Sequence, residues 1–150
     1  MRVVWIGALA GVLGGCSGQL TGEWQGVLEC GTIKYDFSLE MAKDSGKSFS
    51  GTGVQEREFT AVDGNTTFEE IEFDILASLA RGGGAQSVDV EMTCTFEQVV
   101  VTGIDGEDEP QLVRETCRPL RFRNYQAAWD GKDQLTFEGE DACEGTVNRL

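Results

Sequence analysis

The fold class follows from residues 88–97, VDVEMTCTFE. Apolar and polar side chains alternate at every step, which places one set on each face of an extended chain. A strand of this kind buries one face and leaves the other in water. Because much of the remaining chain repeats the pattern, the sequence predicts an all-β domain.

Three further runs alternate with a period of two, at residues 24–30, 35–39 and 71–75. Turn-forming residues separate the runs, at 43–46 (KDSG), 63–65 (DGN), 81–84 (RGGG), 104–106 (IDG) and 130–133 (DGKD). About eight short strands joined by tight turns, with no helices between them, predict a single antiparallel barrel or sandwich. The pattern is the same for both, so the choice between them stays open here. The inward set is expected to contain Trp24, Phe37, Val90, Met92, Phe96 and Phe137.

Residues 66–82 fit two patterns. Ile71 and Ile75 alternate with acidic residues as in a strand, but Phe68 and Leu79 extend them into a helical face as well. We favour a strand over 66–76 and leave 76–82 open.

The cysteine count indicates disulfides. Apart from Cys16 there are four cysteines, an even number that indicates two bridges in an exported protein, and none has the Cys-x-x-Cys spacing of a zinc or redox site. The turn residues Asp105 and Gly106 lie midway between Cys94 and Cys117. A hairpin centred there places these two cysteines opposite each other, close enough to form a bridge.

The remaining pair is then Cys30 with Cys143, which joins the first strand to the last. Of the three possible pairings of four cysteines we favour this one. Cys117 has the opposite parity to Phe122, so the pairing needs a one-residue shift of register, which we expect as a bulge near Pro119.

The first residues have the pattern of an export signal. Arg2 precedes an apolar run that ends near Leu13 and is shorter than the roughly 20 apolar residues that span a bilayer. The tetrapeptide Leu13-Gly14-Gly15-Cys16 resembles the lipobox of bacterial lipoproteins.

That resemblance implies removal of residues 1–15, lipid on Cys16, a short tether over 16–20 and a β-rich domain over 21–150. It places the domain at the cell envelope. In a Gram-negative cell, Ser17 after the cysteine favours the outer membrane.

The charge narrows the range of partners. The chain has 12 basic and 26 acidic residues, a net charge of −14, and loss of Arg2 with the signal leaves −15 on 135 residues. A field of that sign disfavours nucleic acid and anionic headgroups and attracts cationic proteins, although solubility alone also explains an acidic surface.

A second resemblance concerns the start of the domain. Gly22-Glu23-Trp24 resembles the Gly-x-Trp signature of lipocalins and related calycins, and the run 20–26 with SGTG at 50–53 is similar to the opening hairpin of avidin-type barrels. The resemblance implies a barrel that holds a small ligand. For Trp24 itself we favour a core residue that plugs one end.

Several chemistries are excluded or disfavoured. Histidine is absent, which excludes Ser-His-Asp and Cys-His catalysis and imidazole ligands. SGKS at 45–48 lacks the first glycine of a phosphate-binding loop and indicates a hairpin turn. The acidic residues of 105–109 do not match a calcium loop and indicate a solvated tip. We expect no metal, no cofactor and no catalytic residues.

Three functions remain. We favour a non-catalytic, lipid-anchored envelope protein with a barrel-like binding domain whose ligand the sequence does not identify. If that ligand is small and apolar, the barrel needs an empty interior. The alternative is a protein-interaction module or an inhibitor of a cationic envelope enzyme, which requires a filled core and an exposed acidic or aromatic patch. A carboxylate-based hydrolase is third. The ligand-binding residues are not identifiable from the sequence.

Overall fold

The computed structural model describes residues 20–80, 86–106, 108–118, 122–139 and 143–150. Nine strands and one short 3₁₀ helix, η1 (Ile104–Gly106), lie in these ranges. The strands are β1 (Gly22–Cys30), β2 (Ile33–Ser45), β3 (Ser48–Thr60), β4 (Thr66–Leu79), β5 (Gln86–Thr102), β6 (Gln111–Arg114), β7 (Phe122–Trp129), β8 (Gln134–Gly139) and β9 (Cys143–Arg149). Among the described residues no helix is long and apolar enough to cross a membrane.

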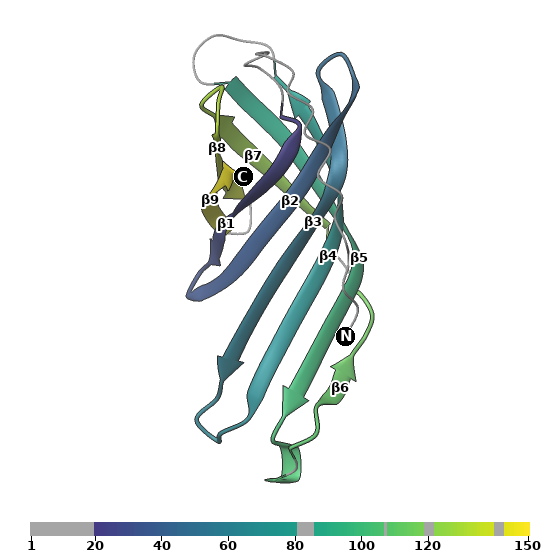
Figure 1. Ribbon diagram of the computed structural model, residues 1–150, viewed down its shortest axis with the longest axis vertical. Coiled ribbons are helices and arrows are strands. Elements are labelled where there is room, and N and C mark those ends of the chain that lie inside the picture. The colour runs from purple at the N-terminus through teal and green to yellow at the C-terminus, as the bar shows by residue number, and fades with distance from the viewer. Residues whose placement is uncertain (1–19, 81–85, 107, 119–121, 140–142) are drawn as a thin grey trace.

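Eight of the strands form a closed antiparallel barrel (Figure 1). Neighbours in the ring are mostly neighbours in the chain, and β9 returns to pair with β1. The expectation of an all-β, antiparallel, disulfide-tied domain is confirmed, and the structure selects the barrel over the sandwich. β4 is a strand throughout, so the strand favoured over 66–76 is confirmed and continues to Leu79, where a helix had been left open.

The seam between β1 and β9 closes the barrel. Cys30 lies opposite Cys143 and forms a disulfide with it. Gly26 and Gly145 allow the two backbones to come close, because a Cβ on either glycine would lie 2.1 Å from a carbonyl oxygen of the other strand. The predicted joining of the first strand to the last is therefore present.

β3, β4 and β5 continue beyond the ring. β2 accompanies β3 only as far as Glu56, and β7 accompanies β5 only as far as Thr93. The projecting part, which we call the flap, consists of residues 57–69, 98–106 and 108–114, with β6 paired to the end of β5. It extends from the lower end of the barrel in Figure 1.

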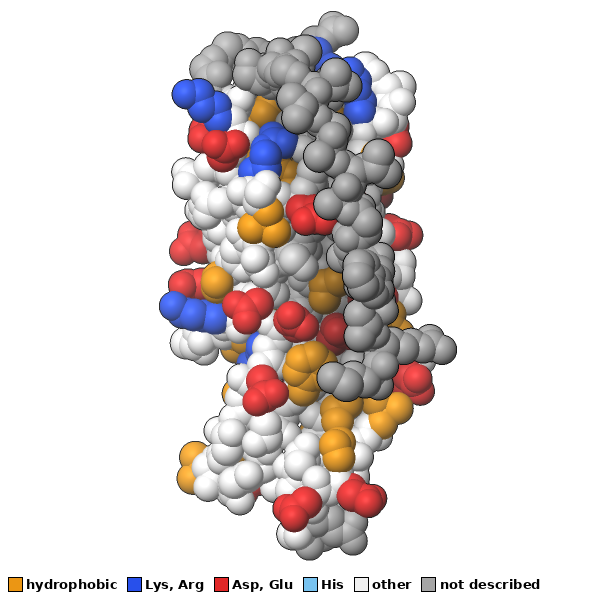
Figure 2. Space-filling model, in the orientation of Figure 1, with side chains coloured by type: hydrophobic (Ala, Val, Ile, Leu, Met, Phe, Trp, Pro, Cys, Tyr) orange, Lys and Arg blue, Asp and Glu red, His pale blue; other side chains and the backbone are white. Residues whose placement is uncertain are grey.

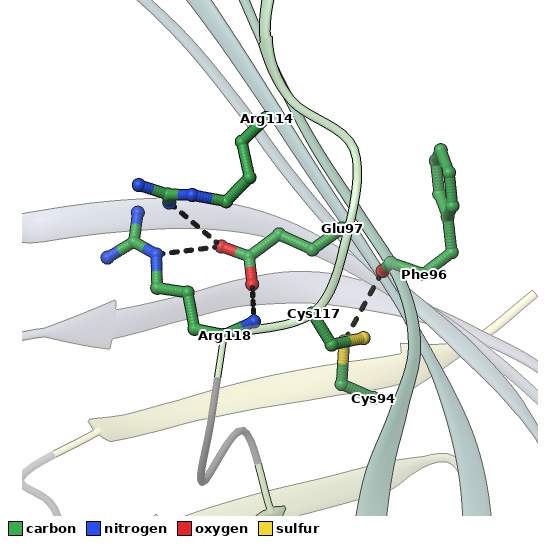
Figure 3. Close-up of a disulfide and its surroundings, with 6 residues drawn as sticks. All are labelled: Cys94, Phe96, Glu97, Arg114, Cys117 and Arg118. Atoms are coloured by element: carbon green, nitrogen blue, oxygen red, sulfur yellow. Dashed lines mark hydrogen bonds and ion pairs between the residues drawn. A yellow bond between two sulfur atoms is a disulfide. The ribbon is translucent and has the colours of Figure 1, made fainter.

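A bulge in β5 changes which residues face inward. Phe73 pairs with Cys94 and Glu72 with Phe96, so Thr95 is the extra residue. The bulge reverses the alternation that follows: Glu97 is buried, whereas Phe96 is only partly buried and points to the opposite side of β5 (Figure 3). The expectation that Phe96 faces the core was wrong for this reason.

The barrel interior is packed. Trp24, Phe37, Met92 and Phe137 belong to one buried cluster, and the ring of Phe137 packs edge-on against Phe37 and Tyr125. Trp24 is fully buried at one end of the barrel, where its indole N–H donates to the Leu20 carbonyl. A cavity lined by described core residues, among them Phe37, Met92 and Phe137, measures about 10 Å³, close to the smallest volume that holds one water molecule.

Candidate functional site

A network of charged side chains lies where the barrel meets the flap. It comes from β2, β3, β4, β5, β6 and the segment after β6, and contains Tyr35, Arg57, Glu69, Glu97, Arg114 and Arg118. We call it the junction network.

Glu97 is the most buried charge of this network, with 1% of its surface exposed. The Arg118 backbone N–H donates to its Oε2 at 3.0 Å, and the Arg118 Nε lies 3.1 Å from its Oε1. Arg114 Nη1 approaches the same Oε1 to 3.5 Å. Figure 3 shows both guanidinium groups converging on this carboxylate next to the Cys94–Cys117 disulfide. The bridge and the ion pairs together hold the segment after β6 against β5.

The second half of the network lies on the flap side. Arg57 Nε donates to Glu69 Oε2 at 2.5 Å, and the Tyr35 hydroxyl donates to the same oxygen at 3.4 Å. The Arg57 guanidinium stacks 5.2 Å from the Tyr35 ring centroid and 4.4 Å from that of Phe59.

The protonation of Glu69 follows from these contacts. Burial alone raises the pKa of Glu69, but the hydrogen bond and charge of Arg57, with contributions from Arg118 and Tyr35, outweigh it and hold the pKa below its ordinary value. The hydrogen bond to Glu69 in turn raises the pKa of Arg57. A general acid needs a carboxyl that keeps its proton near neutral pH. The pKa of Glu69 is lowered instead, so this carboxylate suits a structural ion pair better than the role of general acid in a hydrolase.

Beside this network, within the part of the chain that the structure describes, Gln55 has a buried side-chain amide without hydrogen-bond partners. It is fully buried, and neither its Oε1 nor its Nε2 has a hydrogen-bond partner. The register places Gln55, Ile71 and Glu97 in one row across β3, β4 and β5.

The flap exposes apolar surface. Seven large hydrophobic side chains are exposed among the described residues, and four of them lie on the flap: Phe59, Val62, Leu112 and Val113. Their exposed fractions run from 39% to 109%. Figure 2 shows orange hydrophobic side chains together with red acidic ones at the lower end of the molecule. Such a concentration on one projecting element is typical of an interaction surface.

A second surface feature lies on the barrel wall. A groove of about 780 Å³ is lined mainly by exposed residues of β4, β5 and β7, among them Leu76, Asp89, Glu91 and Asn124. Leu76 is the one exposed large hydrophobic side chain in its lining. The exposed residues of the groove are therefore polar apart from Leu76, and buried side chains such as Phe49, Val90 and Tyr125 complete its lining.

The structure places the sequence-predicted sites as follows. Cys94 pairs with Cys117, and Cys30 with Cys143, as expected. A register shift between β5 and β6 occurs at Val99/Val100. The bulge expected near Pro119 lies outside the described residues. Cys16 and the whole predicted signal also lie outside them.

Two predicted loops can also be located. SGKS at 45–48 forms the tight turn between β2 and β3, as expected, with Gly46 at φ 55°. Of the acidic segment, Asp105, Asp108 and Glu109 lie between β5 and β6, and Glu107 lies outside the described residues. The described residues contain no group of three or more side chains placed to hold a metal ion.

The junction network was not predicted. Glu97 falls on the polar side of the alternating stretch 88–97, so its pattern indicates a solvated carboxylate. The one local sign in the sequence that the inward-facing positions change is the run Val99–Val101, in which the alternation of apolar and polar residues stops. Arg114 and Arg118 flank Cys117, but only the three-dimensional register brings them to Glu97.

Comparison of the chain with models of known protein families, with curated proteins and with solved structures gave no match.

Proposed function

We propose that this protein is a lipid-anchored envelope protein whose β domain acts through contacts with another protein and does not enclose a small ligand. The observation that carries the proposal is the filled core. A ligand pocket of the usual size measures about 300–1,000 Å³, whereas the cavity lined by the described core residues measures about 10 Å³. Aromatic rings, including those of Phe37 and Phe137, occupy the middle of the barrel, where a calycin ligand would sit. The exposed side chains of the flap provide the interaction surface instead.

Native mass spectrometry of the full chain, purified from the membrane in a gentle detergent, tests this proposal. We expect the mass of the processed chain with its lipid and no retained small molecule. A stoichiometric apolar compound that leaves only when the protein unfolds would contradict the proposal and favour the ligand-binding barrel.

The anchor is a separate part of the proposal, and it depends on the lipobox. We expect a Cys16→Ala variant to incorporate no fatty acid and to remain unprocessed, because the thiol is the site of acylation. Metabolic labelling with an alkyne fatty acid measures this, with a Ser17→Ala variant as the control that keeps its label. Labelling of the Cys16→Ala chain would show that the lipobox assignment is wrong.

A further inference from the structure

The outer face of the flap combines an apolar stripe with an acidic border. Phe68 on β4 pairs with Val100 on β5, which pairs with Leu112 on β6. Side chains of paired residues lie on the same face of a sheet, so these three form one row across three strands. We call this row the outer stripe. Phe68 and Val100 are partly exposed, and Leu112 is 53% exposed.

Carboxylates border the outer stripe on the same face. Glu58 pairs with Phe68 and continues the row onto β3. Two residues along, Glu56 pairs with Glu70, and Glu72 follows on the same face of β4. Burial raises the pKa of Glu70, and the charges of Glu72 and Glu56 raise it further, while a hydrogen bond from Gln98 opposes the change. These like charges therefore crowd one another, and a cation placed among them would relieve the repulsion.

The charges also discriminate between possible occupants. A second copy would bring an identical set of carboxylates against this one, and an anionic membrane surface would be repelled in the same way. Interfaces between proteins usually combine an apolar centre with a polar, charged rim. The groove on the barrel wall also has one exposed large hydrophobic side chain, Leu76, but the other exposed residues of its lining are polar, so it lacks a row of adjacent apolar side chains.

We propose that the outer stripe is the docking site for a cationic partner protein, which places an apolar segment on Phe68, Val100 and Leu112 and its lysines or arginines against Glu58 and Glu70. This inference rests on the proposed function and names the site and the chemistry of the partner. Burial of the stripe's apolar surface supplies affinity. The carboxylates make the site specific for cationic partners and raise the association rate.

A peptide probe tests the inference. The full chain is held in zwitterionic nanodiscs, and fluorescence anisotropy measures binding of a heptapeptide with Leu-Val-Leu flanked on each side by two lysines. A peptide of equal charge with serines in the centre, and one with glutamates in place of the lysines, are the comparison ligands. We expect the first peptide to bind about tenfold tighter than the serine peptide and the glutamate peptide not to bind.

Matched variants locate the site. Val100→Ser combined with Leu112→Ser should weaken binding of the probe about tenfold. Val27→Ser, at an exposed apolar position on the opposite wall, should leave binding of the probe unchanged. Glu58→Lys should weaken binding of the probe, and Glu40→Lys, on the barrel wall, should weaken it far less. Thermal unfolding of each variant checks that the barrel remains folded.

Three outcomes would overturn the docking site. The first is an equal loss of probe binding in the Val27→Ser control. The second is a loss of probe binding in Leu76→Ser, which would place the site in the wall groove. The third is a dimer of the wild-type chain that the stripe substitutions dissociate. The first two leave the proposed function intact if native mass spectrometry finds no core ligand, so the two failures are distinguishable.

Discussion

At the scale of single residues, Gln55 holds two of the three buried side-chain polar atoms that lack a hydrogen-bond partner among the described residues. Both amide atoms are buried without a partner, and each such atom costs about 1–3 kcal/mol. Gln55→Met keeps the volume and removes both polar atoms. We expect the free energy of unfolding in urea to rise by about 1 kcal/mol or more.

The control for that prediction is Gln98→Met. Gln98 donates to Glu70 at 3.1 Å, so its replacement removes a satisfied hydrogen bond and should bring no gain. A less stable Gln55→Met variant would mean that the amide is satisfied in solution, by water or by a bound molecule.

The lowered pKa of Glu69 predicts how the stability of the protein depends on pH. Its folded-state pKa is held below the ordinary value, so the pair contributes stability above the unfolded-state pKa of about 4.3 and loses it as the pH falls through the folded-state value. Glu69→Gln should therefore lower the stability at pH 7 and flatten the loss of stability below about pH 5. Urea unfolding at a series of pH values measures both effects.

The exposed ion pair of Glu29 and Lys34 serves as the comparison for Glu69. Both side chains are largely solvated, at 46% and 69% exposure, and such pairs contribute little. Glu29→Gln should leave the stability at pH 7 nearly unchanged. An equal effect of the two substitutions would contradict the importance given to the Glu69 contacts.

The residue scale is also where sequence reasoning succeeded least. Phe96 and Glu97 exchanged faces because the extra residue Thr95 lies inside an uninterrupted alternation, with no glycine or proline to mark it. A bulge of this kind is decided by pairing with β4, which is a long-range contact. Trp24 was predicted as a core plug and is fully buried, because a large aromatic side chain at an inward position has few other places to go.

At the scale of strands and hairpins, the sequence was more informative. The hairpin around residues 105–106 and the pairing of Cys94 with Cys117 follow from local spacing and are present in the structure. The length of the flap was not predictable, because it depends on where β2 and β7 stop accompanying their neighbours. That depends on the shear of the closed ring, a property of all eight strands together.

The two disulfides differ in the length of the chain that they close, 113 residues for Cys30–Cys143 against 23 for Cys94–Cys117. In the chain-entropy model this difference makes the longer bridge more stabilising by about 1.4 kcal/mol. We expect the Cys30→Ala, Cys143→Ala double variant to unfold at lower urea concentration than Cys94→Ala, Cys117→Ala. The reverse order would show that the shorter bridge acts mainly through the ion pairs of Glu97 that it holds in place.

At the scale of the whole molecule, alternation predicted strands but not closure. Barrels and sandwiches share the period of two, and the decision lies in the contact of β1 with β9, at opposite ends of the chain. Gly26 and Gly145 permit that contact, and the predicted Cys30–Cys143 bridge joins the same two strands, but such a bridge fits a barrel and a sandwich alike. The calycin resemblance remains a prediction, and the empty interior that it implies is not found in the described core.

We propose that this protein works through the surface of its flap and not through the interior of its barrel. Site-specific photo-crosslinking in the intact cells that produce the protein tests it most directly, with the photoreactive residue at Leu112 on the flap or at Val27 on the wall. We predict one protein adduct of defined mass from position 112, diminished by Glu58→Lys, and none from position 27. Adducts from position 27 alone, or no protein adduct from position 112, would contradict the claim.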